Sequence, residues 1–196
     1  MTHNCFQQPL IQGNYYHIYN RANSRERLFH FDDNYFYFLH KYASYLANYV
    51  DTFAYCLLPN HFHLFVRLKQ TISSPDESPI TASNQFRKFF ITYSQAINKQ
   101  QNRTGSLFQK PFRRVPVENE THFHALIFYI HANCQKHNPA VDFRHYPFSS
   151  YQTYLSDKPT LLKRDEILDM FDGREAFIRF HEDMKNCRLD GDLRME

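Results

Sequence analysis

The chain has 196 residues, of which 42% are hydrophobic and 22% are charged, as is typical of a soluble globular protein. Aromatic residues make up 17% of the chain, which excludes a disordered protein. Only 4 glycines occur, and neither a GxGxxG pattern nor a P-loop is present. This excludes the common glycine-rich phosphate-binding enzymes.

No apolar run approaches the length of about 20 residues that spans a bilayer. The segment MTHNCFQQPL lacks the basic and apolar regions of a signal peptide. The four cysteines are scattered and form no CxxC pair, which excludes a cysteine-based zinc knuckle and fits a reducing compartment. We therefore expect a cytoplasmic protein.

The net charge is only +3, but the positive charges are concentrated in one stretch. Residues 78–117 contain seven basic residues and no acidic residue, with aromatic and polar residues between them. This pattern is typical of a surface that contacts a nucleic-acid backbone. A solvated basic face without a partner is the commoner meaning of a charge cluster, so composition alone leaves both interpretations open.

Hydrophobic periodicity and turn residues predict the secondary structure. In chain order, the expected elements are a strand over 14–21, a helix over about 33–49, strands over 52–58 and 61–68, a polar loop over 71–80, a helix over about 81–100, a strand over 112–117, a helix over about 119–133, and two short helices over about 164–171 and 174–186. Pro59 and Asn60 form the turn of a hairpin, and Pro116 restricts its strand to a sheet edge. This order predicts an α+β, ferredoxin-like split βαβ fold, an antiparallel sheet with helices on one face. The acidic segment 159–196 is expected as a helical tail packed on, or appended to, the domain formed by residues 1–158.

His61 and His63 lie two positions apart on the third predicted strand. Side chains alternate across a strand, so both imidazoles point to one face while Phe62, Leu64 and Val66 point to the other. Two imidazoles placed in this way can hold a divalent metal ion. An HxH pair on its own is weak evidence, because most such pairs are surface or hydrogen-bonded histidines.

Tyr129 and Asn133 are four residues apart in the third long helix and therefore share one helical face. The amide oxygen of Asn133 suits Mg²⁺ or Mn²⁺. A phenol beside such a metal can attack a phosphate and form a covalent phosphotyrosine. The plainer alternative is a half-buried helix tyrosine whose hydroxyl reaches the surface.

Several stretches of the chain resemble one family. They are YYHIYNRANSRERLF (15–29), YCLLPNHFHLFVRL (55–68), RTGSLFQKPFRRVPV (103–117), FYIHAN (128–133) and YPFSSYQTYL (146–155). In this order the stretches resemble the single-tyrosine HUH transposases, in the branch of REP-associated tyrosine transposases. One departure is Cys134, where the family commonly has proline.

The resemblance implies a function for residues 1–158 as an HUH transposase-like catalytic domain. His61, His63 and Asn133 would hold a divalent metal, Mg²⁺ or Mn²⁺, and Tyr129 would be the nucleophile. The implied reaction cleaves single-stranded DNA to a 5′-phosphotyrosine and a free 3′-OH, near a DNA hairpin, and rejoins it by the reverse step. The resemblance also implies a bacterial cytoplasmic protein that acts as a monomer or a homodimer.

We expect the DNA backbone to contact arginines and lysines of the basic stretch. The first candidates are Arg103, Lys110, Arg113 and Arg114, and the second are Arg21 and Arg25. For each of them, an exposed basic residue without a function is about as common. Bases would stack on tyrosine or phenylalanine rings that the sequence does not identify.

Two other functions remain compatible with the residues. The first is a non-catalytic regulator that binds DNA hairpins on the same scaffold, which requires only the basic stretch. The second is a structural metal site, such as zinc, in a protein with no nucleic-acid role. The intact set of His61, His63, Tyr129 and Asn133 favours the enzyme over both.

Overall fold

The computed structural model describes residues 9–70 and 81–188, so the predicted loop at 71–80 lies outside the described residues. Within this part of the chain, four strands form one antiparallel sheet in the order β2-β3-β1-β4. The strands are β1 (Tyr15–Arg21), β2 (Val50–Leu58), β3 (His61–Leu68) and β4 (Arg113–Val117). β4 lies at an edge, as Pro116 predicts.

Six α-helices accompany the sheet in the described residues. They are α1 (Asp32–Leu46), α2 (Ala82–Gln100), α3 (Glu120–His137), α4 (Tyr151–Leu155), α5 (Arg164–Met170) and α6 (Arg174–Arg188). The order β1-α1-β2-β3-α2-β4 and the antiparallel sheet confirm the predicted α+β, split βαβ fold. None of the helices in residues 9–70 and 81–188 has the length and apolar character needed to cross a membrane.

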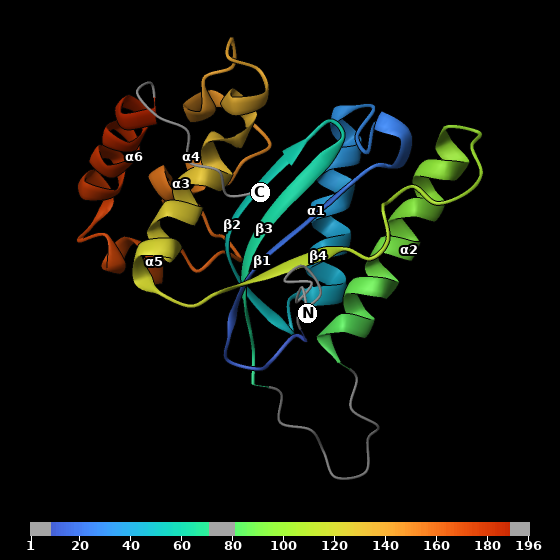
Figure 1. Cartoon of the computed structure of the whole chain (residues 1–196), viewed down its shortest axis with the longest axis horizontal. Coiled ribbons are helices and arrows are strands. Elements are labelled where there is room, and N and C mark those ends of the chain that lie inside the picture. Colours follow the sequence, from blue (N-terminus) through green and yellow to red (C-terminus); the bar gives the residue numbers. More distant parts are fainter. Residues whose placement is uncertain (1–8, 71–80, 189–196) are drawn as a thin grey trace, which may run out of the picture.

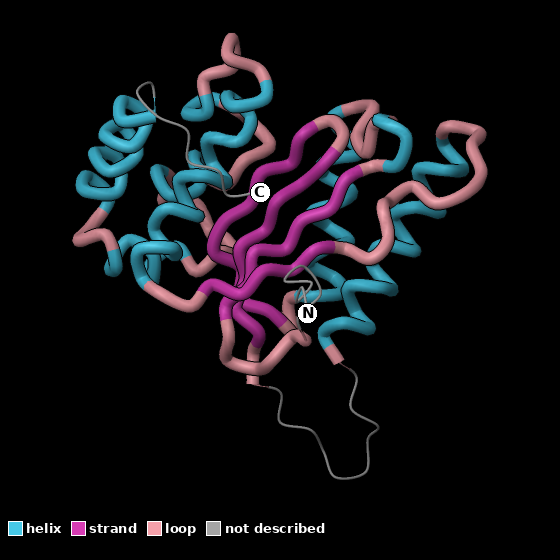
Figure 2. The backbone as a smooth tube through the Cα atoms, viewed as in Figure 1, coloured by secondary structure: helices cyan, strands magenta, loops and turns pink. Residues whose placement is uncertain are grey.

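Helices cover both faces of the sheet, which corrects the expectation that they lie on one face (Figure 1). On β3, Phe62, Leu64 and Val66 join the core formed with α1 and α2. Phe65 points the other way and joins a second core formed with α3 and the C-terminal helices. Figure 2 shows the strands as a layer between these two groups of helices. The correction follows from strand alternation, because a sheet face that carries His63 and Phe65 must also be covered.

Helix α3 is longer than predicted and ends at His137 rather than near residue 133. Its N-terminus is capped by Asn119, whose side chain accepts a hydrogen bond from the backbone N–H of His122. Cys134 keeps the backbone N–H that a proline would lack, so the helix continues until Asn138 and Pro139. This extra turn brings His137 against His61 of β3 and places Lys136 over the ring of Tyr129.

The chain that follows α3 is attached to the outer edge of β2, the edge that does not pair with β3. Leu162 forms a bridge with Thr52, and Ser149 forms one with Cys56. The apolar side chains of α5 and α6 belong to the same buried cluster as those of β2 and α3. Ile167 and Phe177 are fully buried members of that cluster.

Phe177→Ala should lower the free energy of unfolding by about 3–5 kcal/mol, because a fully buried ring leaves a cavity between α6 and α3. Urea denaturation of the full chain measures this change. Phe36→Ala is the matched control, since that ring is 62% exposed and its loss should change stability by no more than about 0.5 kcal/mol. Equal stability of the two variants would contradict a shared core.

Candidate active site

Strands β1 and β3 gather a cluster of rings on the sheet face that α3 covers. Their antiparallel register sets Tyr19 opposite His63 and Arg21 opposite His61. His17 lies on the same face of β1, and its ring stacks on Tyr19 with centroids 4.7 Å apart. The sheet pairing therefore supplies two rings, His17 and Tyr19, that the sequence analysis did not single out.

The ring of His61 is held from both sides. Its Nδ1 lies 2.6 Å from Asn60 Oδ1, and its Nε2 lies 3.2 Å from Asn133 Oδ1. The Asn60 oxygen can only accept, so the proton of a neutral His61 ring lies on Nδ1. Nε2 then directs its lone pair at the Asn133 oxygen, which is also an acceptor. Two facing acceptors repel, and two arrangements remove the repulsion: a cation between them, or rotation of the Asn133 amide so that Nδ2, which has no hydrogen-bond partner among the described residues, donates to His61.

His63 presents an unused nitrogen at the same place. Its Nδ1 hydrogen-bonds to His17 Nε2 at 2.9 Å, whereas its Nε2 is buried and has no hydrogen-bond partner in the described structure. Burial holds the pKa of His63 well below its ordinary value, and the nearby His17 and His61 rings lower it further. The ring is therefore neutral at neutral pH, the form in which imidazole binds metals.

These donors fit a divalent metal ion. The His61 and His63 rings lie with centroids 5.2 Å apart, and the amide oxygen of Asn133 lies 3.2 Å from His61 Nε2. The pairings with Asn60 and His17 resemble the outer hydrogen bonds that orient metal-binding histidines. Within residues 9–70 and 81–188, no group of three or more His, Cys, Asp or Glu side chains is arranged to hold a metal. The candidate site therefore depends on the amide as its third ligand, and the unpaired His63 Nε2 is the observation that supports it.

Tyr129 packs directly against the histidines. Its ring meets those of His63 and His17 edge to face, with centroids 5.6 and 5.9 Å apart. Lys136 Nζ lies 5.2 Å from the centre of the ring. The side chain is fully buried, so it is not the half-buried tyrosine of the plainer alternative. The structure thus brings His61, His63, Asn133 and Tyr129 together, but with Tyr129 covered.

A cavity of about 260 Å³ adjoins the histidines on the side of β1 and β4. Its lining residues are polar, aromatic or basic: Tyr19, Asn20, Arg21, His61, His63, Gln109 and Arg113. The Arg113 guanidinium lies 5.8 Å from the centre of the Tyr19 ring, which also stacks on His63. The cavity therefore combines a tyrosine ring, two arginines and both histidines of the predicted metal site.

The other predicted DNA contacts are not gathered there. Arg103 forms an ion pair with Glu26 and donates to Asn98 Oδ1 at 2.6 Å. Arg114 points to the opposite sheet face and lies over the ring of Phe112. Lys110 is exposed on the loop before β4. The side chain of Arg25 lies outside the described part of the structure.

The extra turn of α3 adds another residue to the cluster. The ring of His137 lies 4.6 Å from that of His61, with the two rings at 71°. A sequence signal for His137 existed, because no helix breaker occurs before Pro139. The contacts of Asn60 and His17 had no such signal, since they depend on a turn conformation and on strand register.

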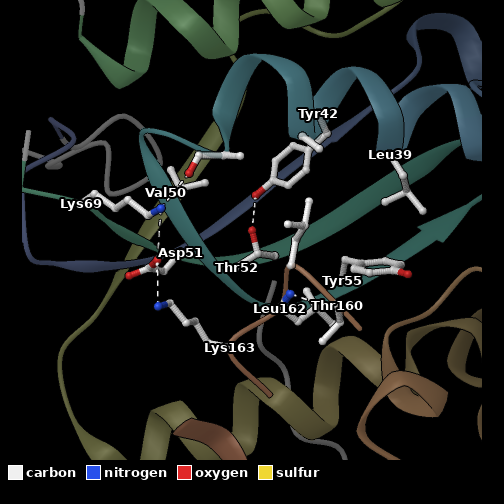
Figure 3. Close-up of a pocket in the computed structure, with 13 residues that line it drawn as sticks. Leu39, Tyr42, Val50, Asp51, Thr52, Tyr55, Lys69, Thr160, Leu162 and Lys163 are labelled. Carbon is white, nitrogen blue, oxygen red and sulfur yellow. Dashed lines mark hydrogen bonds and ion pairs between the residues drawn. The ribbon is translucent and has the colours of Figure 1, made fainter. Parts of the chain in front are cut away.

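A larger cavity of about 480 Å³ lies elsewhere, between α1 and the outer side of β2 (Figure 3). Its polar groups already have partners within it. Tyr42 and Thr52 share a hydrogen bond of 2.7 Å, and Lys69 and Lys163 both pair with Asp51. It contains none of the metal-binding or nucleophilic candidates, whereas the smaller cavity is lined by His61 and His63.

His63→Ala should weaken Mn²⁺ binding at least about 100-fold, because it removes one of three protein ligands. Isothermal titration calorimetry with manganese chloride measures the affinity. The matched control is His145→Ala, since the side chain of His145 is 78% exposed and lies outside the cluster. If both variants bind Mn²⁺ as tightly as the unaltered chain, the metal is held elsewhere.

No family model matches the sequence, and no curated protein matches it. Among solved structures, the chain is similar to a REP-associated tyrosine transposase bound to a REP hairpin. The two share 18% sequence identity with a TM-score of 0.62, over 79% of this chain and 87% of the other. The likeness shows that this chain has the fold expected from the sequence resemblance.

Proposed function

We propose that this chain is a metal-dependent enzyme that nicks and rejoins single-stranded DNA at hairpins, and that it belongs to the REP-associated branch of the single-tyrosine HUH transposases. The observation that carries the proposal is the convergence of His61, His63, Asn133 and Tyr129 where β3 meets α3. The fold likeness to a transposase described as bound to a REP hairpin supports a transposase-like function at DNA hairpins.

In the proposed reaction, the Tyr129 oxygen forms a bond to the phosphorus of one phosphodiester. The bond from phosphorus to the 3′-oxygen breaks, which leaves a 5′-phosphotyrosine and a free 3′-OH. The phenol loses one proton and the departing 3′-oxygen gains one, so protons balance. One phosphodiester replaces another, so the reverse attack by a 3′-OH needs no external energy source.

His61, His63 and Asn133 would hold the divalent metal, Mg²⁺ or Mn²⁺. When bound, such an ion would withdraw charge from phosphate oxygens and so stabilise the pentacoordinate transition state. Asn60 and His17 keep the histidine rings in the orientation that this binding requires.

The cavity beside the histidines suits the DNA strand that passes the site. Arg21 and Arg113 would neutralise backbone phosphates next to the scissile one. Tyr19 would offer its ring to a base, with the Arg113 guanidinium above it. Gln109 adds a neutral polar side chain at the same wall.

Burial of Tyr129 favours one other function. A nucleophile without exposed surface cannot meet DNA until the contacts to His17 and His63 separate. A non-catalytic regulator that binds DNA hairpins needs no such movement. The two functions differ in whether a covalent product forms.

Incubation with long circular single-stranded DNA and Mn²⁺ should give a covalent protein–DNA adduct that survives denaturing electrophoresis. Chelation of the metal and Tyr129→Phe should each abolish the adduct, because one removes the charge stabilisation and the other the nucleophilic oxygen. Tyr45→Phe is the matched control, since Tyr45 lies on α1 and its hydroxyl bonds to Thr92.

An adduct that persists in Tyr129→Phe would overturn the assignment of the nucleophile. If the protein binds hairpins tightly but forms no adduct with hairpin repeats of its own genome, it functions as the non-catalytic regulator. Such binding would be indifferent to chelator and to Tyr129→Phe.

Arg113→Gln should weaken hairpin binding and lower the slope of log K against log salt by about 1, because one phosphate contact is lost. Fluorescence anisotropy over a salt series measures both quantities. Arg179→Gln is the control, since Arg179 is exposed on α6 away from the cavity. Identical slopes for the two variants would remove Arg113 from the DNA path.

A further inference from the structure

A chain of buried hydrogen bonds connects α6 to the helix that carries Tyr129. His131 on α3 bonds through Nδ1 to Nε2 of His181 on α6, at 2.9 Å. Through its own Nε2, His131 bonds to Ser150 Oγ at 2.8 Å. Ser150 Oγ in turn accepts the backbone N–H of Tyr55 on β2, at 2.9 Å. The proposed catalysis uses neither histidine.

Only one arrangement of protons gives each of these hydrogen bonds both a donor and an acceptor. The carbonyl of Phe177 can only accept, so His181 Nδ1 donates to it, at 2.8 Å. The neutral His181 ring then accepts at Nε2 from His131 Nδ1. His131 in turn accepts at Nε2 from the Ser150 hydroxyl, whose other possible acceptor, the Tyr55 carbonyl, is farther away at 3.3 Å. The sequence of donors and acceptors therefore runs without a break from α6 to β2.

This series of hydrogen bonds lies entirely inside the second core. His131, His181 and Ser150 have no exposed surface. Burial lowers the pKa of both rings, and that of His181 to about 4, so both stay neutral at neutral pH. Leaving one member unpaired in this core would cost far more than an exposed hydrogen bond contributes.

The position of His131 on α3 connects these hydrogen bonds to the candidate active site. His131 lies between Tyr129 and Asn133 in sequence and points to the opposite side of the helix. These hydrogen bonds therefore fix one side of α3, and the opposite side presents the proposed nucleophile and the proposed third metal ligand. The other end of the series is on β2, which pairs with the strand that carries His61 and His63.

We propose that His131 and His181 are positioning residues that hold α3 in register with the sheet, so that α6 takes part in building the active site. This rests on the proposed function, because its effect is read at Asn133 and Tyr129. Packing by apolar side chains alone would tolerate small rotations of α3, whereas a directional chain of hydrogen bonds does not.

The test compares two substitutions at one position in the full chain. His181→Leu keeps the apolar bulk but removes the acceptor for His131. His181→Gln keeps an acceptor oxygen at about the same reach. The readouts are Mn²⁺ affinity by calorimetry, the single-turnover rate of adduct formation, and hairpin affinity.

We expect His181→Leu to weaken Mn²⁺ binding by about 10-fold to 100-fold, as the loss of an outer hydrogen bond does at other metal sites. The adduct rate should fall by a similar factor while hairpin affinity stays within about twofold. His181→Gln should restore both toward the unaltered values. Met184→Ala is the matched control, because Met184 packs on the same core from α6 but takes no part in this series of hydrogen bonds.

Unaltered Mn²⁺ affinity and adduct rate in His181→Leu would overturn the proposal, as would equal losses in Met184→Ala. If His181→Leu does not fold, Ser150→Ala removes the donor at the other end and should weaken Mn²⁺ binding in the same direction. Unchanged affinity in that variant would also overturn it. Absence of Mn²⁺ binding and of adduct in the unaltered chain is a separate result, which refutes the proposed function instead.

Discussion

The alternation of side chains along β3 is the constraint on which the rest of the structure depends. It directs Phe62 and Leu64 into one core and His61 and His63 into the contact with α3. An unpaired polar group in such a contact costs about 1–3 kcal/mol, so each imidazole needs a partner. The partners present also decide which nitrogen remains available. Asn60 pairs with Nδ1 of His61 and His17 with Nδ1 of His63, so Nε2 of His61 is directed at Asn133 and Nε2 of His63 has no hydrogen-bond partner among the described residues.

The sequence predicts the elements and the polar face of β3 well, because both depend on local periodicity. It also predicts that Tyr129 and Asn133 share a side of their helix. The expectation that the helices cover only one face of the sheet was wrong, and the composition of α3, which covers the other face, shows why. From Leu126 to Cys134 every residue of α3 is buried. A helix buried all round has no apolar stripe from which its orientation can be derived.

The other features of the site that the sequence did not predict depend on contacts between segments far apart in the chain. His17 reaches His63 only because β1 pairs with β3 in one particular register. Arg103 belongs to the same basic stretch as Arg113, yet it forms an ion pair with Glu26, a residue 77 positions away. Basic residues therefore mark a surface in the sequence, and tertiary structure decides which of them face the cavity.

The same packing that assembles the site also restricts how Tyr129 can be uncovered. On its front, the ring lies against His17 and His63, and the back of the helix is bonded through His131 to α6 and Ser150. If α3 moved alone, it would leave buried hydrogen-bonding groups without partners on its back. A movement of α3 together with α6 would keep the bond between His131 and His181, and a movement of the Tyr129 side chain alone would keep the whole chain of bonds. In the proposed reaction, the Tyr129 phenol would therefore be uncovered most readily by a movement of its side chain or of α3 and α6 as a unit.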